Sequence, residues 1–461
     1  MANAKPYYTS DDLVESVKRR ISYPLSQNTF QYSDIMAFLN EELQLSAVPA
    51  VKMEHEEYFV YKKTVPLVNG ISRYEIPDRA IGMALRDLKY SDSQGNFYDT
   101  TRIAPDDKAF FQQSNGSNQT ISKYYLEGNE IVLTPQVQSG ASGMLNFFIF
   151  LRPNSLVRND RACKIQSYLK KVIISDIADL GNGDQVIIST GVQSPTPAEN
   201  IFTAVTSITG SNQFLIVSGD ASATAINLKN AINAANITNI SAVIDSVNAY
   251  QVNVSYKDIS VSFETVKAIY GNPSAFTIDN TTIYILFDQL PTLYTDPETD
   301  IQSTLYYNNC LVDFLQTNPG HRTYNYDVTL LSITPAPTIL LPNAALGQFN
   351  VSELQSYLTN SSGGSLDFYN IKIGDYICLQ NECIIPQIPP ELHNALAERA
   401  ASRVLMAIGD VQGYQISQAK LAEMNKMQET LIGSRVESSV TKVFNRYSLL
   451  RLGKSRFRRR Y

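Results

Sequence analysis

The spacing of the hydrophobic residues changes along this chain, and that change restricts its fold more than any other feature. Residues 1–57 and 386–433 carry apolar side chains at helical spacing, whereas residues 58–163 alternate with a period of two. Helices and strands segregated in this way favour an α+β fold over an alternating α/β fold. We therefore expect a discontinuous antiparallel helical core from both termini, carrying a β-rich region and an inserted β-rich domain.

Two helices are expected on the N-terminal side of this core. Thr9 and Asp12 form a capping box, and the first helix should end near Tyr23-Pro24, because the residue before a proline avoids helical geometry. Ser33 is the expected cap of the second helix. The residues expected to face inward are Leu13, Val14, Val17, Ile21, Ile35, Phe38, Leu39 and Leu43.

Short runs with strand periodicity fill the β-rich region 58–163. Turn signals such as Asn69-Gly70 and Glu127-Gly128-Asn129 separate these runs and indicate hairpins. The expected strands are 58–60, 74–76, 85–90, 123–126, 131–133 and 145–151.

Residues 164–320 form the expected inserted domain, and a returning β segment, 321–385, follows it. Asn, Ser and Thr dominate the insertion, where strand-like runs surround one expected helix at 223–235. In the returning segment, Cys378 and Cys383 flank a short turn, and a zinc site would need two further ligands that the neighbouring sequence does not supply. Two small buried residues are expected, and a disulfide is the open alternative.

A pair of antiparallel helices is expected over 386–433. Gly409-Asp410 should end the first of them, and the short link that follows makes the two helices neighbours. The residues expected to face inward are Leu392, Leu396, Ala400, Val404, Ile408, Tyr414, Leu421, Met424, Met427 and Leu431. Those expected to face outward are Glu391, His393, Glu398 and Arg403.

The last segment, 434–461, is expected to be a basic aromatic docking arm. From Lys442 onward it carries eight cations and no acidic residue, although the net charge of the chain is −6. The alternative is a solvated charged tail, but such tails are poor in the aromatic and large apolar residues found here. The candidate docking residues are Phe444, Arg446, Tyr447, Leu449, Leu450, Arg451, Arg456, Phe457, Arg458, Arg459, Arg460 and Tyr461.

Motifs of catalysis and cofactor binding are lacking in the sequence. It contains three histidines, far apart, and no metalloprotease helix, phosphate loop or nucleophile elbow. His55 lies among glutamates and reads as part of a solvated stretch, and Gly181-Asn-Gly183 reads as a turn. We expect no enzyme activity, no cofactor, no metal site and no membrane span.

Several stretches resemble head-to-tail adaptor, or connector, proteins of short-tailed bacteriophages. They cover about the first 165 residues and most of the chain after Pro319, in the same order, and leave 164–320 unmatched. The stretches are Val17-Lys-Arg-Arg-Ile21 with Gln27-Asn-Thr-Phe30, Glu56-Glu-Tyr-Phe-Val60, Tyr74-Glu-Ile-Pro-Asp-Arg-Ala-Ile-Gly82 with Leu85-Arg-Asp-Leu88, Tyr125-Leu-Glu-Gly-Asn-Glu130, Leu151-Arg-Pro-Asn-Ser-Leu156, Ile373-Gly-Asp-Tyr-Ile377, Pro386-Gln-Ile-Pro-Pro-Glu-Leu392 and Asn445-Arg-Tyr-Ser-Leu-Leu-Arg451.

This resemblance implies a structural virion protein in the neck between head and tail, made in the host cytoplasm during assembly. Self-association on the portal would give a ring of about twelve copies. The implied partners are the portal protein, reached by the C-terminal arm, the nozzle or hub proteins of the tail, and viral DNA passing through without sequence-specific binding. Two alternatives remain open, a peptidoglycan-degrading virion protein and a receptor-recognising tail or fibre protein.

Overall fold

A computed structural model of the chain has a mixed α+β fold in two bodies. The first body consists of 1–19, 23–40 and 154–387, and the second of 20–22, 41–153 and 388–461. The structure describes residues 7–21, 30–92, 94–107, 123–134, 143–190, 198–245, 248–257, 262–266, 275–278, 282–290, 309–317, 324–335, 344–350 and 371–432.

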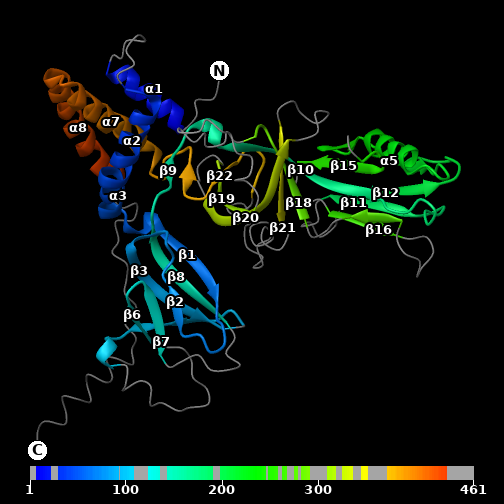
Figure 1. The fold of residues 1–461 in the computed structure, drawn as a ribbon, viewed down its shortest axis with the longest axis horizontal. Coiled ribbons are helices and arrows are strands. Elements are labelled where there is room, and N and C mark those ends of the chain that lie inside the picture. The colour runs from blue at the N-terminus through cyan, green and yellow to red at the C-terminus, as the bar shows by residue number, and fades with distance from the viewer. Residues whose placement is uncertain are drawn as a thin grey trace, which may run out of the picture. The chain divides into compact units, whose positions relative to one another are not determined.

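An antiparallel barrel is the centre of the first body (Figure 1). Its strands, in the order of their pairing, are β10 (Cys163–Ile174), β18 (Thr282–Phe287), β21 (Ala345–Asn350), β20 (Tyr324–Pro335), β19 (Cys310–Leu315) and β22 (Tyr376–Leu379). The barrel closes because β22 also pairs with β10, with Cys163 opposite Ile377. Fully buried rings fill the interior, among them Phe314 and Phe349, whose centroids lie 5.6 Å apart.

The second half of β10 continues beyond the barrel into a lobe that also holds α5 (Ala221–Ala234). There it pairs with β15 (Gln251–Tyr256) and β17 (Phe276–Ile278), and β14 (Ile240–Ile244) pairs with β15. A four-stranded sheet completes this α5 lobe, in the order β13 (Gln213–Leu215), β12 (Ala198–Val205), β11 (Gln185–Thr190) and β16 (Ser262–Val266).

The barrel and the α5 lobe share one hydrophobic core, in which Phe202, Leu228 and Val252 of the lobe belong to the same buried cluster as the barrel residues. Residues 164–320 and 321–385, expected from the sequence as an insertion and a returning segment, therefore contribute strands to one sheet and side chains to one core. The expected helix at 223–235 is present as α5, which Asp220 caps by accepting a hydrogen bond from the Ala223 N–H at 2.9 Å.

The N-terminal helices are α1 (Ser10–Arg20) and α2 (Tyr32–Glu42). The capping box of α1 is confirmed, because the Thr9 N–H donates to Asp12 Oδ2 at 3.0 Å and the Asp12 N–H reaches Thr9 Oγ1 at 3.4 Å. The prediction for Ser33 was wrong. That residue lies inside the first turn of α2, and the carboxylate of Asp34 instead accepts a hydrogen bond from the Gln31 N–H at 2.8 Å.

Two packed sheets form the β-rich part of the second body, with Leu88, Leu133 and Phe147 in their common core. One sheet has the order β1 (Val60–Pro66), β8 (Met144–Leu151), β3 (Ala80–Ser91) and β4 (Phe97–Asp99). The other has the order β2 (Arg73–Glu75), β7 (Glu130–Thr134), β6 (Lys123–Glu127) and β5 (Thr101–Arg102).

Five of the six strands expected in this region are present, and the strand expected at 58–60 is not. Residues Glu56–Phe59 form a single 3-10 turn, η2, in which the Tyr58 N–H donates to His55 O at 3.1 Å, and β1 begins only at Val60. The hairpin expected at Glu127-Gly128-Asn129 joins β6 to β7, and Gly128 has the positive φ of 62° that favours glycine.

The helices of the second body are α3 (Val48–Glu54), α7 (His393–Ile408) and α8 (Val411–Ile432). Between α2 and α3 the chain forms a π-helical turn, η1 (Leu43–Ala47). The expected hairpin of α7 and α8 is present: Gly409 has φ 84°, and the Asp410 N–H donates to Leu405 O at 3.0 Å. A hydrogen bond from Arg399 to Asn425 at 2.7 Å ties the two helices together.

Candidate assembly surface

The docking arm expected from the sequence lies outside the described residues. This applies to all twelve candidate residues between Phe444 and Tyr461, because the described chain ends at Ile432, the last residue of α8. The candidate surface is therefore built from the helices that precede the arm.

Ion pairs join α7 to the residues that end the two N-terminal helices. Arg20 Nε lies 2.8 Å from Glu398 Oε2, and Arg403 Nε lies 2.7 Å from Glu42 Oε1. The carboxylates of Glu398 and Glu42 are nearly buried, and Glu398 also accepts a hydrogen bond from Ser417 Oγ at 2.8 Å. Charge-assisted hydrogen bonds withdrawn from water in this way hold helices in a fixed register.

The outward positions predicted for Glu398 and His393 were wrong. Helix α7 is buried on most sides between His393 and Leu405, so Glu398 and His393 meet partners inside the body rather than water. Glu398 lies between Arg20 and Ser417. His393 is fully buried, and its Nε2 lies 3.4 Å from Ile388 O.

The turn between α7 and α8 is flanked by large apolar side chains that are exposed. These residues, which we call the turn cluster, are Met406, Ile408, Val411 and Ile416. Val411 is 66% exposed and Ile416 is 56% exposed. Contiguous exposed apolar patches mark interaction sites, so we take the segment that carries these four residues as the candidate interaction surface.

Two residues expected to face inward, Ile408 of the turn cluster and Met427, are instead 49% and 59% exposed. The burial of α7 ends at Leu405, and the last turn of the helix, from Met406 to Ile408, is exposed. Met427 lies about three turns farther along α8 than Ile416.

Three carboxyl groups of the first body have raised pKa values, which bears on the enzyme alternative. Burial raises the pKa of Asp375 to about 6, and burial is also the main cause that raises the pKa of Glu382 and Asp288. Asp375 accepts hydrogen bonds from the N–H groups of Thr317 at 2.9 Å and Lys372 at 2.7 Å. These contacts fix two chain segments to each other, which is a structural role.

The other two carboxylates are likewise engaged. Glu382 pairs with Arg161 at 2.5 Å, and Asp288 accepts a hydrogen bond from the Lys164 N–H at 2.8 Å. Within the described ranges, no group of three or more His, Cys, Asp or Glu residues is placed to hold a metal ion.

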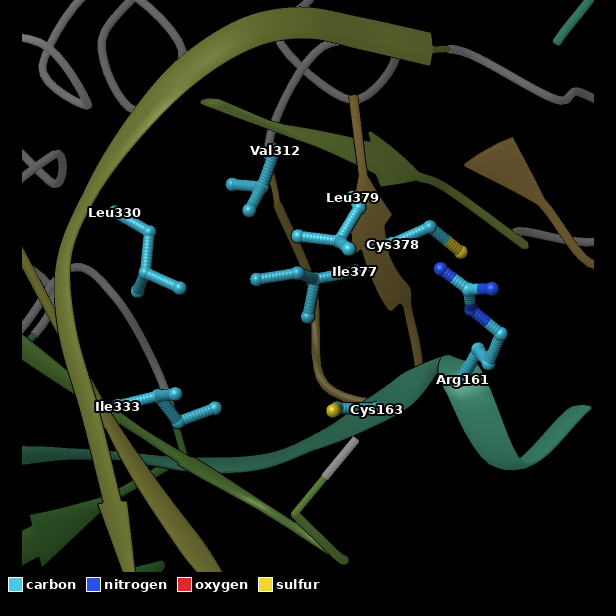
Figure 2. A pocket seen from close by; sticks show the side chains of 8 residues that line it. All are labelled: Arg161, Cys163, Val312, Leu330, Ile333, Ile377, Cys378 and Leu379. Atoms are coloured by element: carbon cyan, nitrogen blue, oxygen red, sulfur yellow. The ribbon is translucent and has the colours of Figure 1, made fainter. Parts of the chain in front are cut away.

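A small cavity lies in the barrel wall between β10, β19, β20 and β22 (Figure 2). Its volume is about 10 Å³, which is the room for about one water molecule and far too little for a sugar or a cofactor. The side chains that line it are Arg161, Cys163, Val312, Leu330, Ile333, Ile377, Cys378 and Leu379.

The cysteines near this cavity are free and buried. Burial raises the pKa of the Cys163 and Cys378 thiols, so both are held as unreactive thiols at neutral pH. Cys378 and Cys383 are the two small buried residues that the sequence predicted.

Comparisons with known proteins assign no family to the chain. No protein-family model matches it, and no curated protein is similar in sequence. Among solved structures, it has a weak similarity to the flagellar cap protein of Escherichia coli, with 9% identity and a TM-score of 0.17, over 91% of this chain and 76% of that one. A score this low supports no common fold. In the part of the chain that is described, no helix is both long and apolar enough to cross a membrane.

Proposed function

We propose that this protein is a structural component of a bacteriophage virion, a head-to-tail adaptor that assembles as a ring below the portal. In this role it extends the DNA channel and offers a platform to tail proteins. The observation that carries the proposal is the turn cluster, an exposed apolar surface on a helix hairpin that ion pairs fix in place. The order of the adaptor-like stretches along the sequence supports it independently.

The proposal includes a helical core closed from both termini. Arg20 ends the first helix and pairs with Glu398 of α7, and Glu42 ends the second helix and pairs with Arg403 of α7. Such a core gives each copy a rigid helical part, and the turn cluster would then pack against the next copy in the ring. The residues before Lys442 carry a net negative charge, which is compatible with a channel through which DNA slides, since a basic lining would bind the DNA phosphates.

The proposal assigns the C-terminal arm to the portal. Its aromatic and apolar residues, Phe444, Tyr447, Leu449 and Leu450, would be buried anchors, each worth on the order of 2 kcal/mol or more. The terminal arginines would lie at the rim, where exposed ion pairs contribute roughly 0–1 kcal/mol and weaken with salt.

The turn cluster and the arm can be tested with the purified portal protein. The turn variant carries Val411→Ser and Ile416→Ser, and the control carries Ile71→Ser, which changes an apolar residue of the same body that is 44% exposed. The mass of the particle formed with portal should fall for the turn variant, because copies no longer associate, and should be unchanged for the control. Equal particles from all three proteins would contradict a role of the turn cluster in assembly.

Two truncations separate the anchors from the rim. Removal of 456–461 should weaken portal binding modestly and flatten its salt dependence, whereas removal from Phe444 onward should abolish attachment. Normal attachment of the longer truncation, at low and high salt, would make the arm a solvated tail and remove portal docking from its role.

A further inference from the structure

Helix α5 lies between the outer strands of the two sheets in its lobe. As described, β13 is the last strand of one sheet and β14 the last strand of the other, and α5 packs against both. Its apolar face, with Leu228 and Ile232, is buried in the core. At about 3.6 residues per turn, Asn227 and Asn233 fall on opposite flanks of that face.

Both asparagines make hydrogen bonds to strand backbone. Asn233 Nδ2 donates to Ala242 O at 2.8 Å, and Asn233 Oδ1 accepts from the Ala242 N–H at 2.8 Å. On the other flank, Asn227 Nδ2 donates to Leu215 O at 2.9 Å. An asparagine amide carries the same donor and acceptor as a peptide group, so Asn233 makes the pair of bonds that a further antiparallel strand would make to β14.

The sequence of β14 explains why its edge needs such protection. It reads Ile240-Ser-Ala-Val-Ile244, with β-branched residues and no charge or proline. Exposed edges with this composition pair readily with strands of other molecules, and proteins commonly prevent that with charges, proline or a covering element. Strand β14 has neither charges nor a proline, and α5 is the element that covers its edge.

Another asparagine of the same body, outside α5, makes the same pair of bonds as Asn233. Asn40, on α2, accepts a hydrogen bond from the Leu156 N–H at 2.6 Å and donates to Leu156 O at 3.0 Å. Leu156 belongs to β9 (Ser155–Leu156), whose other side pairs with β23 (Glu382–Cys383). Two helices thus present an asparagine to a strand edge with the same geometry.

We propose that α5 is an edge lock, in which Asn227 and Asn233 occupy the outer backbone groups of β13 and β14 and keep a second copy of the chain from adding a strand there. The lock matters most where copies are concentrated next to one another. It rests on hydrogen bonds within the α5 lobe and does not depend on the proposed virion function.

The test compares Asn233→Ala with Asn230→Ala in the full chain. Asn230 is an exposed asparagine of the same helix whose side chain makes no hydrogen bond to any described residue, so it controls for the loss of an amide from α5. Hydrogen exchange at the Ala242 amide should be about tenfold faster or more in Asn233→Ala and unchanged in the control. Light scattering should show concentration-dependent association of Asn233→Ala alone.

A second change directs the test to the edge itself. Adding Val243→Lys to Asn233→Ala places a charge on β14 and should return the protein to the monomer, because a charged edge rejects another strand. If Asn233→Ala does not fold, Asn227→Ala tests the same idea at Leu215 with the loss of a single bond. Unchanged exchange at Ala242, a variant that stays monomeric, or association equal to that of the control would each overturn the edge lock.

Discussion

The ion pair between Arg20 and Glu398 joins two chain segments within the second body that are far apart in the sequence. The two residues are 378 positions apart in sequence, and their side chains are 22% and 6% exposed. Charge-assisted bonds with this little exposure are roughly twice as strong as neutral ones, and we expect a coupling free energy of about 1–2 kcal/mol. Arg20→Met alone should cost about 2–3 kcal/mol, since it leaves the nearly buried Glu398 carboxylate with the neutral hydroxyl of Ser417 in place of a cation.

The coupling is measured with a double-mutant cycle of Arg20→Met and Glu398→Gln. The free energy of opening is followed by hydrogen exchange at the amides of α7, which report on the second body. Arg73→Met with Glu130→Gln is the control cycle, because that pair has a similar distance of 2.9 Å but its side chains are 53% and 35% exposed. The control should give less than about 0.5 kcal/mol. A coupling for Arg20 and Glu398 no larger than the control would refute the reasoning.

Three further predictions concern the first body. Gly347→Ala should lower the free energy of unfolding, measured by urea titration, by about 1–3 kcal/mol, because the added Cβ would lie 2.5 Å from Phe287 Cε2 in a filled core. An unchanged urea midpoint would show that the Phe287 ring can move away. Asp220→Ala should destabilise α5 by about 1 kcal/mol, seen as faster exchange in its first turn, whereas Asp220→Asn should be nearly neutral. Burial raises the pKa of Asp375 from 3.8 to about 6, so the folded state binds the proton more tightly than the unfolded state does. The free energy of unfolding should therefore fall by about 3 kcal/mol as the pH rises from about 4 to about 6. Asp375→Asn should remove this pH dependence, and a pH dependence that persists in the variant would assign it to another group.

The sequence predicted the elements whose ends carry a capping residue or a turn residue. The capping box of Thr9 and Asp12 located the start of α1, and Gly409 located the end of α7, because a cap or a left-handed residue acts within one turn. The turn at Gly128 located the β6–β7 hairpin in the same way.

Features that depend on distant neighbours could not be predicted. The pairing of Cys163 with Ile377 closes the barrel, yet the sequence around neither residue indicates that the two will pair. The apolar stripe of α7 predicted one buried face, but α7 is enclosed, so Glu398 turned out to be buried as well. Helix α3 was not predicted; Pro49 lies in its first turn, where a proline is tolerated.

The candidate site was predicted only in part. The sequence marked the helix pair as important, but it placed Ile408 on the buried face, so the turn cluster was not recognised. The helical period indicates which residues share a face of the helix. How much of that face is buried depends on the tertiary packing, which the period does not give.

The closure of the barrel by β22 also has a consequence for how the chain is made. On the ribosome, β10 emerges long before Ile377, the residue that Cys163 must meet. At translation rates of 5–20 residues per second, this delay is roughly 10–40 s. The β6–β7 hairpin can form as soon as it leaves the exit tunnel, but the barrel cannot close until Ile377 has also emerged. Nascent chains of this protein therefore carry an open barrel, and a chaperone that binds strand edges should associate with them until the last strand arrives.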